Sequence, residues 1–156
     1  MSIVTIDPSL NSTAVVIDDK IFSFVNREVA FTKKGNLNKW FEKLNPLVKF
    51  HFISYNNMKD YSSSEINKLS MYDDVTDSIV ETILGNIDGK SCKVFIEGYS
   101  YSSNAGPLID LVTFSTLLRK KLYDITEYID IWSPATLKLE SAKLSYPAIP
   151  IGKRVI

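Results

Sequence analysis

Two short apolar runs of the sequence, residues 3–7 (IVTID) and 93–97 (KVFIE), each end in a carboxylate. Their content of β-branched and aromatic residues predicts strands inside a sheet. A bare carboxylate at such a place is costly to remove from water unless something pairs with it. Asp7 and Glu97 are therefore turn-forming residues, halves of ion pairs, or ligands for a cation, and the fold has to accommodate one of these roles.

Further strand patterns surround these two runs. Strands are predicted at residues 3–7, 13–17, 21–31, 93–97 and 128–132. A short helical or irregular piece around 40–44 and a further extended segment around 48–55 are expected after the third of them. The first three strands follow one another closely enough to form an antiparallel meander.

Two helices separate the later strands. A capping box of Ser62 and Glu65 predicts the start of a long amphipathic helix that runs to about residue 87. Pro107 is placed as the first residue of a second helix, which continues to residue 122. The order β-β-β-(β)-α-β-α-β indicates an α/β fold, with a mixed sheet flanked by helices, an antiparallel meander at one edge and parallel strands after the helices.

The two strand-end carboxylates would converge if their strands were parallel neighbours, at the sheet edge where open α/β sheets place ligands. Two unpaired carboxylates would repel, and one would take up a proton. A hard cation such as Mg²⁺ would resolve this conflict. The simpler alternative is that Asp7, before Pro8, and Glu97, before Gly98, are ordinary turn residues.

Three blocks of the sequence resemble the RuvC-type Holliday-junction resolvases, in particular their compact phage versions. The first motif of that family is similar to residues 5–17 (TIDPSLNSTAVVI), and its second to residues 95–122 (FIEGYSYSSNAGPLIDLVTFSTLLRKKL). Residues 131–138 (IWSPATLK) resemble the strand and the segment that precede the final acidic helix of the family. The blocks occur in family order and bracket most of the chain.

The resemblance implies a ribonuclease H-like fold and an endonuclease that cuts branched DNA, such as a Holliday junction, with two Mg²⁺ or Mn²⁺ ions. It implies that Asp7 would contact both ions and Glu97 one of them. Resolvases of this kind act as homodimers, and the helix at 108–122 is a candidate interface. The substrate would be branched DNA, and no membrane partner is expected.

Further DNA contacts are expected around this centre, each with a simpler alternative. Hydroxyl and amide groups after the first strand could touch a phosphate, or simply build a turn. Tyr99 and Tyr101 could stack on a splayed base, or pack on the following helix. Basic residues near the end of the chain could hold phosphates, or be solvated. The candidates are Ser9, Asn11, Ser12, Tyr99, Tyr101, Lys138, Lys143, Lys153 and Arg154.

The chain departs from the family pattern at its end, because no acidic residue follows Glu140. The family places two further acids on a helix beyond this point, and Glu140 and Asp130 are poor substitutes. We interpret residues 1–156 as one nuclease domain that lacks this C-terminal acidic helix, with 33–61 as an insertion. Weak metal binding and little cleavage are expected of the chain as it stands.

Composition limits the alternatives. The 18 basic and 18 acidic residues cancel, but residues 33–49 contain five lysines and one acid, whereas 60–88 contain seven acids and one lysine. Such polarisation can produce one basic face. A single cysteine and the lack of an apolar run of membrane length fit a cytoplasmic protein, in the host cytoplasm if it is viral. The alternatives are a non-catalytic nucleic-acid-binding or virion-assembly module on the same fold, and an actin-like phosphotransferase.

Overall fold

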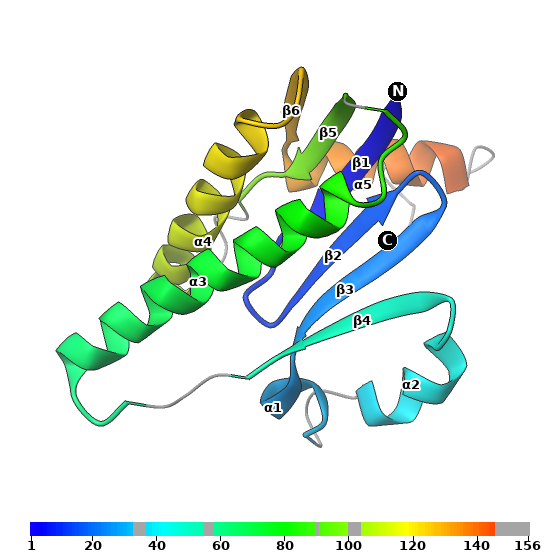
Figure 1. The fold of residues 1–156 in the computed structure, drawn as a ribbon. Helices are drawn as coiled ribbons and strands as arrows, with labels where there is room; N and C mark the ends of the chain where they lie inside the picture. The colour runs from blue at the N-terminus through cyan, green and yellow to red at the C-terminus, as the bar shows by residue number, and fades with distance from the viewer. Residues whose placement is uncertain (33–36, 55–57, 90, 100–103, 146–156) are drawn as a thin grey trace.

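The computed structural model describes residues 1–32, 37–54, 58–89, 91–99 and 104–145. The strands are β1 (Ser2–Asp7), β2 (Ser12–Ile17), β3 (Lys20–Asn26), β4 (Val48–Ile53), β5 (Cys92–Glu97) and β6 (Tyr128–Trp132). The helices are α1 (Arg27–Ala30), α2 (Leu37–Leu44), α3 (Tyr61–Leu84), α4 (Ala105–Tyr123) and α5 (Pro134–Ser145). Together they form an α/β fold with one mixed sheet flanked by helices (Figure 1).

The six strands lie in the order β4-β3-β2-β1-β5-β6. The predicted meander is confirmed, because β1 pairs antiparallel with β2 and β2 pairs antiparallel with β3. The strands that follow the long helices are parallel, as predicted: β5 pairs with β1, and β6 with β5. The prediction that the meander forms an edge of the sheet is wrong, because β4 pairs in parallel with β3 and takes that edge.

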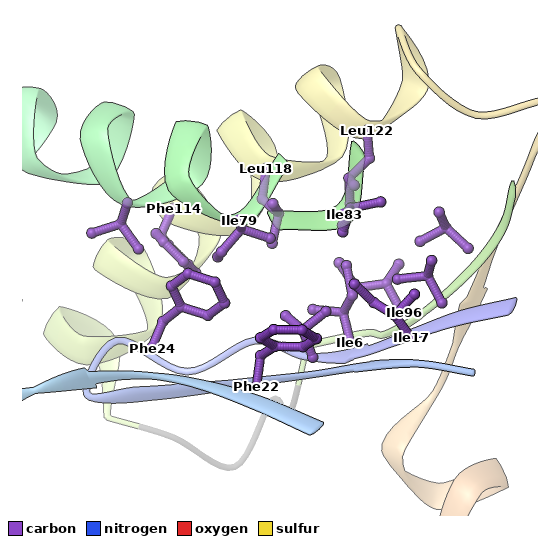
Figure 2. Packing of buried hydrophobic residues seen from close by; sticks show 14 of the residues in the cluster. Ile6, Ile17, Phe22, Phe24, Ile79, Ile83, Ile96, Phe114, Leu118 and Leu122 are labelled. Atoms are coloured by element: carbon purple, nitrogen blue, oxygen red, sulfur yellow. The ribbon is translucent and has the colours of Figure 1, made fainter. Parts of the chain in front are cut away.

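The long helices α3 and α4 cover one face of the sheet (Figure 1). Alternate residues of β1 and β5 point toward them, and Val4 and Val94 are fully buried there. Ile79 of α3 and Leu118 of α4 pack onto this face and are also fully buried (Figure 2). The period of two in the strands and the apolar stripes of the helices therefore produce one continuous core.

The apolar stripe of α4 belongs to this core. Ser115, Leu118 and Leu122 are completely buried within the chain, whereas Ile109 is 65% exposed. This stripe of the helix that was predicted as a candidate dimer interface is therefore occupied by α3 and the sheet. A dimer that uses α4 would have to use the face that carries Ile109.

The opposite face of the sheet is covered by α2 at one end and α5 at the other (Figure 1). Phe41 of α2 packs on Phe50 and Phe52 of β4, with ring centroids 5.4 and 6.1 Å away. Leu137 and Ser141 of α5 face the ends of β1 and β5 across a cavity. Asp7 and Glu97 lie on this second face. The residue before each of them in its strand points into the core, and successive side chains of a strand point to opposite faces.

The third strand is shorter than predicted, ending at Asn26 instead of continuing to residue 31. The side-chain oxygen of Asn26 accepts hydrogen bonds from the backbone N–H groups of Glu28 and Val29, at 3.1 and 3.4 Å. This contact caps α1, so the apolar residues beyond Asn26 are helical. A local side-chain contact thus overrides the alternating pattern.

Both long helices begin two residues earlier than predicted. Asp60, not Ser62, caps α3, since its carboxylate accepts a hydrogen bond of 2.9 Å from the Ser63 N–H. An ionised cap also suits the positive end of a helix. Helix α4 begins at Ala105, and Pro107 occupies its first turn, where a missing N–H costs no intrahelical bond.

Helices and a strand also form where the local sequence pattern is weaker. Within the stretch interpreted as an insertion, 33–61, the structure describes α2 and β4. The extended segment was predicted, and the piece before it, predicted as helical or irregular, is helical. Helix α5 was not predicted; the Ser133 hydroxyl accepts from the Thr136 N–H at 3.1 Å and Pro134 follows it as the first helical residue. No helix in the described part of the chain is long and apolar enough to cross a membrane.

Candidate functional site

Asp7 and Glu97 lie together at the carboxyl ends of the neighbouring parallel strands β1 and β5. The strands are in register at Ile6 and Ile96, so the two carboxylates follow at equivalent positions. Their side chains are close enough to share a hydrogen bond. None of the ion pairs between described residues involves either of them. Among the described residues, the two strand-end carboxylates therefore form a pair that no lysine or arginine neutralises directly.

The proximity of the two carboxylates changes how Glu97 ionises. The pKa of Glu97 is raised to about 7, first by burial, then by the hydrogen bond with Asp7 and by its negative charge. Lys138 of α5 acts in the opposite direction and lowers the pKa of Glu97 through its positive charge. At neutral pH Glu97 is therefore protonated in about half of the molecules, as expected of a carboxyl group in contact with a second, unpaired carboxylate.

The pair lies in a cavity of about 590 Å³ between the sheet and α5. Its walls are largely apolar and include Phe95, Trp132 and Leu137. Apolar walls keep the effective dielectric constant low, which strengthens the interaction of the carboxylates with any charge that enters. The cavity thus combines a small acidic centre with apolar surroundings.

The donor set suits a hard divalent cation. Carboxylate oxygens are the ligands that Mg²⁺ prefers, and Mg²⁺ commonly takes one or two carboxylates from the protein and its remaining ligands from water and substrate phosphates. No group of three or more Asp, Glu, His or Cys side chains forms a metal site in the described ranges. The residues outside those ranges include no Asp, Glu, His or Cys. Asp7 and Glu97 are therefore the only carboxylates that this chain brings to the site.

The two weaker acidic candidates have other partners. Asp130 accepts a hydrogen bond of 2.7 Å from the Trp132 indole N–H. Glu140 forms an ion pair of 2.6 Å with Lys143, one turn along α5. Neither adds a ligand to the pair, which agrees with the expectation that they are poor substitutes for the missing acids of the family pattern.

The polar residues after β1 form a closed turn. The Thr13 hydroxyl donates to the Ser9 carbonyl at 2.7 Å and accepts from the Ser9 N–H at 3.2 Å, so this segment is tied back to β2. The Asn11 carbonyl accepts from the Asn26 N–H at 2.9 Å. Ser12 lies 3.4 Å from Ser23, hydroxyl to hydroxyl, on the second face of the sheet. The backbone groups of Ser9 and Asn11 thus hold this turn, and Asn11 and Ser12 line a separate cavity.

The other residues predicted to contact DNA differ in their surroundings. Tyr99 packs on α4, since the guanidinium carbon of Arg119 lies 4.3 Å from its ring centroid. Lys138 faces the carboxyl pair electrostatically, whereas Lys143 is engaged with Glu140. Tyr101, Lys153 and Arg154 lie outside the described residues.

Arg119 was not recognised in the sequence. One guanidinium nitrogen approaches the Glu97 carbonyl at 3.5 Å, while Nε is buried without a hydrogen-bond partner among the described residues. The contacts of Arg119 with the Glu97 backbone and the Tyr99 ring connect α4 to the end of β5. Nothing in the sequence signals this role, because a basic residue near a helix C-terminus is ordinary.

The residues of α5 that line the cavity were also missed. Leu137 and Ser141 are one helical turn apart and face the carboxyl pair. A signal was available, because Ser133 followed by Pro134 is a standard helix start. Recognising it would have placed a helix at 134–145 against the strand ends.

Comparisons with protein family models, with curated proteins and with solved structures find no match to this chain.

Proposed function

We propose that this chain is a metal-dependent, structure-selective DNA endonuclease of the RuvC type, built on a ribonuclease H-like fold. The observation that carries the proposal is the Asp7–Glu97 pair at the ends of the parallel strands β1 and β5. The sheet order, with an antiparallel meander beside parallel strands, is compatible with that fold. The three sequence blocks that resemble the family add independent support.

The carboxyl pair suggests how the chain would act on a phosphodiester. Asp7 and Glu97 would offer oxygen ligands to a divalent cation, and Glu97 would release its proton as the cation binds. Such a cation would polarise the scissile phosphate and activate water. Lys138, whose positive charge acts on Glu97, would attract the phosphate, and the apolar walls of the cavity would limit access of bulk water.

Two carboxylates favour weak metal binding by the chain alone. The family pattern implies two ions, which need more ligands than Asp7 and Glu97 supply. A second ion would require acidic groups from beyond this sequence. We therefore expect a low affinity for Mg²⁺ and Mn²⁺, and slow cleavage.

The test is cleavage of a labelled four-way DNA junction, with Mn²⁺ binding measured in parallel by electron paramagnetic resonance. Asp7→Asn and Glu97→Gln should each abolish metal-dependent cleavage and weaken Mn²⁺ binding. The matched control is Asp74→Asn, an exposed carboxylate on α3 that lies on the other side of the sheet. Cleavage that persists in both site variants would reject the nuclease proposal.

A second function is favoured by the small number of carboxylates. A non-catalytic nucleic-acid-binding module could keep the fold and the basic residues after losing its metal ligands. It would bind the junction without cutting it, and Asp7→Asn would leave this binding unchanged. The same cleavage and binding measurements therefore separate the two functions.

A further inference from the structure

A second cavity, of about 410 Å³, lies between α2 and the second face of the sheet. Leu37, Trp40 and Leu44 of α2 line it, at the spacing that places side chains on one stripe of a helix. Ser12 of β2 and Ser23 of β3 line its opposite side. This cavity is separate from the one that holds the carboxyl pair, and none of the contacts described so far fills it.

The Trp40 side chain is the most unusual part of this cavity. Trp40 remains 53% exposed although it faces an apolar space, and it makes no ring–ring contact with another described aromatic residue. The ammonium group of Lys43 lies 4.9 Å from the indole centroid. A half-exposed indole with a cation beside it is a surface on which a planar, electron-rich ring can stack.

The opposite side of the cavity can form hydrogen bonds. The hydroxyl groups of Ser12 and Ser23 lie 3.4 Å apart and half-exposed or exposed, so each can also donate to or accept from a ligand. A nucleobase needs an apolar or aromatic surface for its faces and polar groups for its edge. The α2 cavity offers both.

The charge around α2 favours an anionic ligand. Lys39 and Lys43 lie on this helix with one acid, Glu42. Lysines beside a stacking surface are the combination that binds single-stranded nucleic acid, because the cations attract phosphates while the aromatic ring takes a base. A neutral or purely apolar ligand would not need these lysines.

The two cavities lie on the same face of the sheet and meet at Ala14 of β2, which lines both. We propose that the α2 cavity binds an unpaired base of the DNA strand whose phosphodiester lies at Asp7 and Glu97. This inference rests on the proposed function. The stretch interpreted as an insertion would then recognise unpaired DNA next to a branch point.

Fluorescence of Trp40 provides a direct test. The sequence has two tryptophans, so Trp132→Phe leaves Trp40 as the only one. This protein would be titrated in EDTA, where no metal-dependent cleavage occurs, with a 12-nucleotide single strand and with the blunt duplex of the same sequence. We expect the single strand to quench Trp40 and the duplex to leave it nearly unchanged, because only an unpaired base can stack on it.

Affinity measurements on the chain with both tryptophans complete the test. Trp40→Ala should weaken single-strand binding about 5- to 100-fold, as expected for the loss of one base–aromatic stack, and Trp40→Phe should retain most of it. The matched control is Leu47→Ala, an exposed apolar residue (73%) that does not line the cavity and should bind as the wild type. If circular dichroism shows that Trp40→Ala does not fold, the test depends on the fluorescence quenching of Trp40 and on the affinity of Trp40→Phe for the single strand.

The outcomes separate this inference from the proposed function. Equal quenching by single strand and duplex, or unchanged affinity in folded Trp40→Ala, would overturn the base pocket while leaving metal-dependent cleavage intact. Single-strand quenching without any cleavage would support the pocket and favour the non-catalytic function. A wild-type chain that binds neither probe would overturn the base pocket, whereas the proposed function is decided by cleavage of the four-way junction.

Discussion

The two faces of the sheet are covered very differently. On the face beneath α3 and α4, Val4, Ile79, Val94 and Leu118 are completely buried and the packing is continuous (Figure 2). On the other face, α2 and α5 leave two cavities of about 410 and 590 Å³. Strand β1 contributes side chains to both faces, since its alternate residues point to opposite sides of the sheet.

This difference separates stability from function. A close-packed core cannot admit a ligand without losing contacts, whereas an incompletely covered face leaves room for one. The carboxyl pair is tolerated because it lies on the open face, where Asp7 is exposed and Glu97 half-buried. We therefore expect substitutions on the two faces to affect different measurements.

The largest expected effect comes from two isoleucines of β1 that lie on opposite faces. Ile6 is 4% exposed beneath α3 and α4, and Ile3 is 52% exposed on the second face. Ile6→Ala should lower the free energy of unfolding by about 2–5 kcal/mol, because it removes buried atoms and leaves a cavity. Ile3→Ala should cost less than about 1 kcal/mol.

Urea unfolding of both variants, followed by circular dichroism, measures this contrast. Because the two substitutions are identical and lie in the same strand, each serves as the control for the other. Equal losses of stability would mean that the second face is as closely packed as the first, and would contradict the comparison.

The next effect concerns cation binding on the open face. The pKa of Glu97 is raised to about 7, so below pH 7 a cation must displace a proton from the pair. The apparent affinity for Mn²⁺ should therefore fall by up to about tenfold for each pH unit below 7 and level off above it.

Mn²⁺ titrations between pH 5.5 and 8 check this dependence. Glu97→Gln provides the comparison, since a residue that does not titrate should leave a weaker affinity with little dependence on pH across this range. An affinity of the wild-type chain that stays constant from pH 5.5 to 8 would show that Glu97 is already ionised, and that the two carboxylates are not in contact.

A smaller effect is expected on stability. Between about pH 4.5 and pH 7 the folded chain keeps a proton on Glu97 that the unfolded chain has lost, because burial and Asp7 raise the pKa of Glu97. The unfolded state then binds fewer protons, so the free energy of unfolding falls as pH rises through this window. Glu97→Gln removes this loss and should stabilise the chain at pH 8 by on the order of 1 kcal/mol, allowing for solvent screening.

Thermal or urea unfolding at pH 4 and pH 8 tests the sign. The advantage of Glu97→Gln over the wild type should be absent at pH 4, where Glu97 is protonated in both states, and fully present at pH 8. An advantage of the same size at both values would point to a packing effect instead of a charge effect.

The sequence predicted the features that depend on local patterns. Strand-end positions and a period of two were sufficient to place Asp7 and Glu97 at equivalent ends of β1 and β5, and the parallel pairing of these strands brings them together. Their convergence was thus foreseeable once the strand order was known. The raised pKa of Glu97 follows from the same proximity.

Features that depend on non-local contacts or on side-chain capping were missed. The end of β3 is set by the Asn26 side chain, and the start of α3 by Asp60. The edge position of β4 depends on pairing across a separation in the chain that no local pattern encodes. The α2 cavity arises from how Trp40 lies over the sheet, which a helical period predicts only as an apolar stripe.

The smallest expected effect sharpens the comparison within the open face itself, using two lysines of α5. Lys138 lowers the pKa of Glu97, whereas Lys143 is paired with Glu140 at 2.6 Å. Lys138→Gln should raise the pKa of Glu97 further and, above pH 7, strengthen Mn²⁺ binding by about 0.2–1 kcal/mol, because one positive charge no longer repels the cation. Lys143→Gln should change neither quantity.

These two substitutions remove the same charge from the same helix, so any difference between them reflects which lysine faces the carboxyl pair. The pKa of Glu97 can be followed by carbon NMR of labelled glutamate, and Mn²⁺ affinity by titration at pH 8. If both variants behave alike, α5 affects the site only through its overall charge, and Lys138 has no particular place at the carboxylates. If Lys138→Gln alone strengthens metal binding while it weakens DNA binding, the same lysine opposes the cation and attracts the phosphate, as a nuclease site on this face requires.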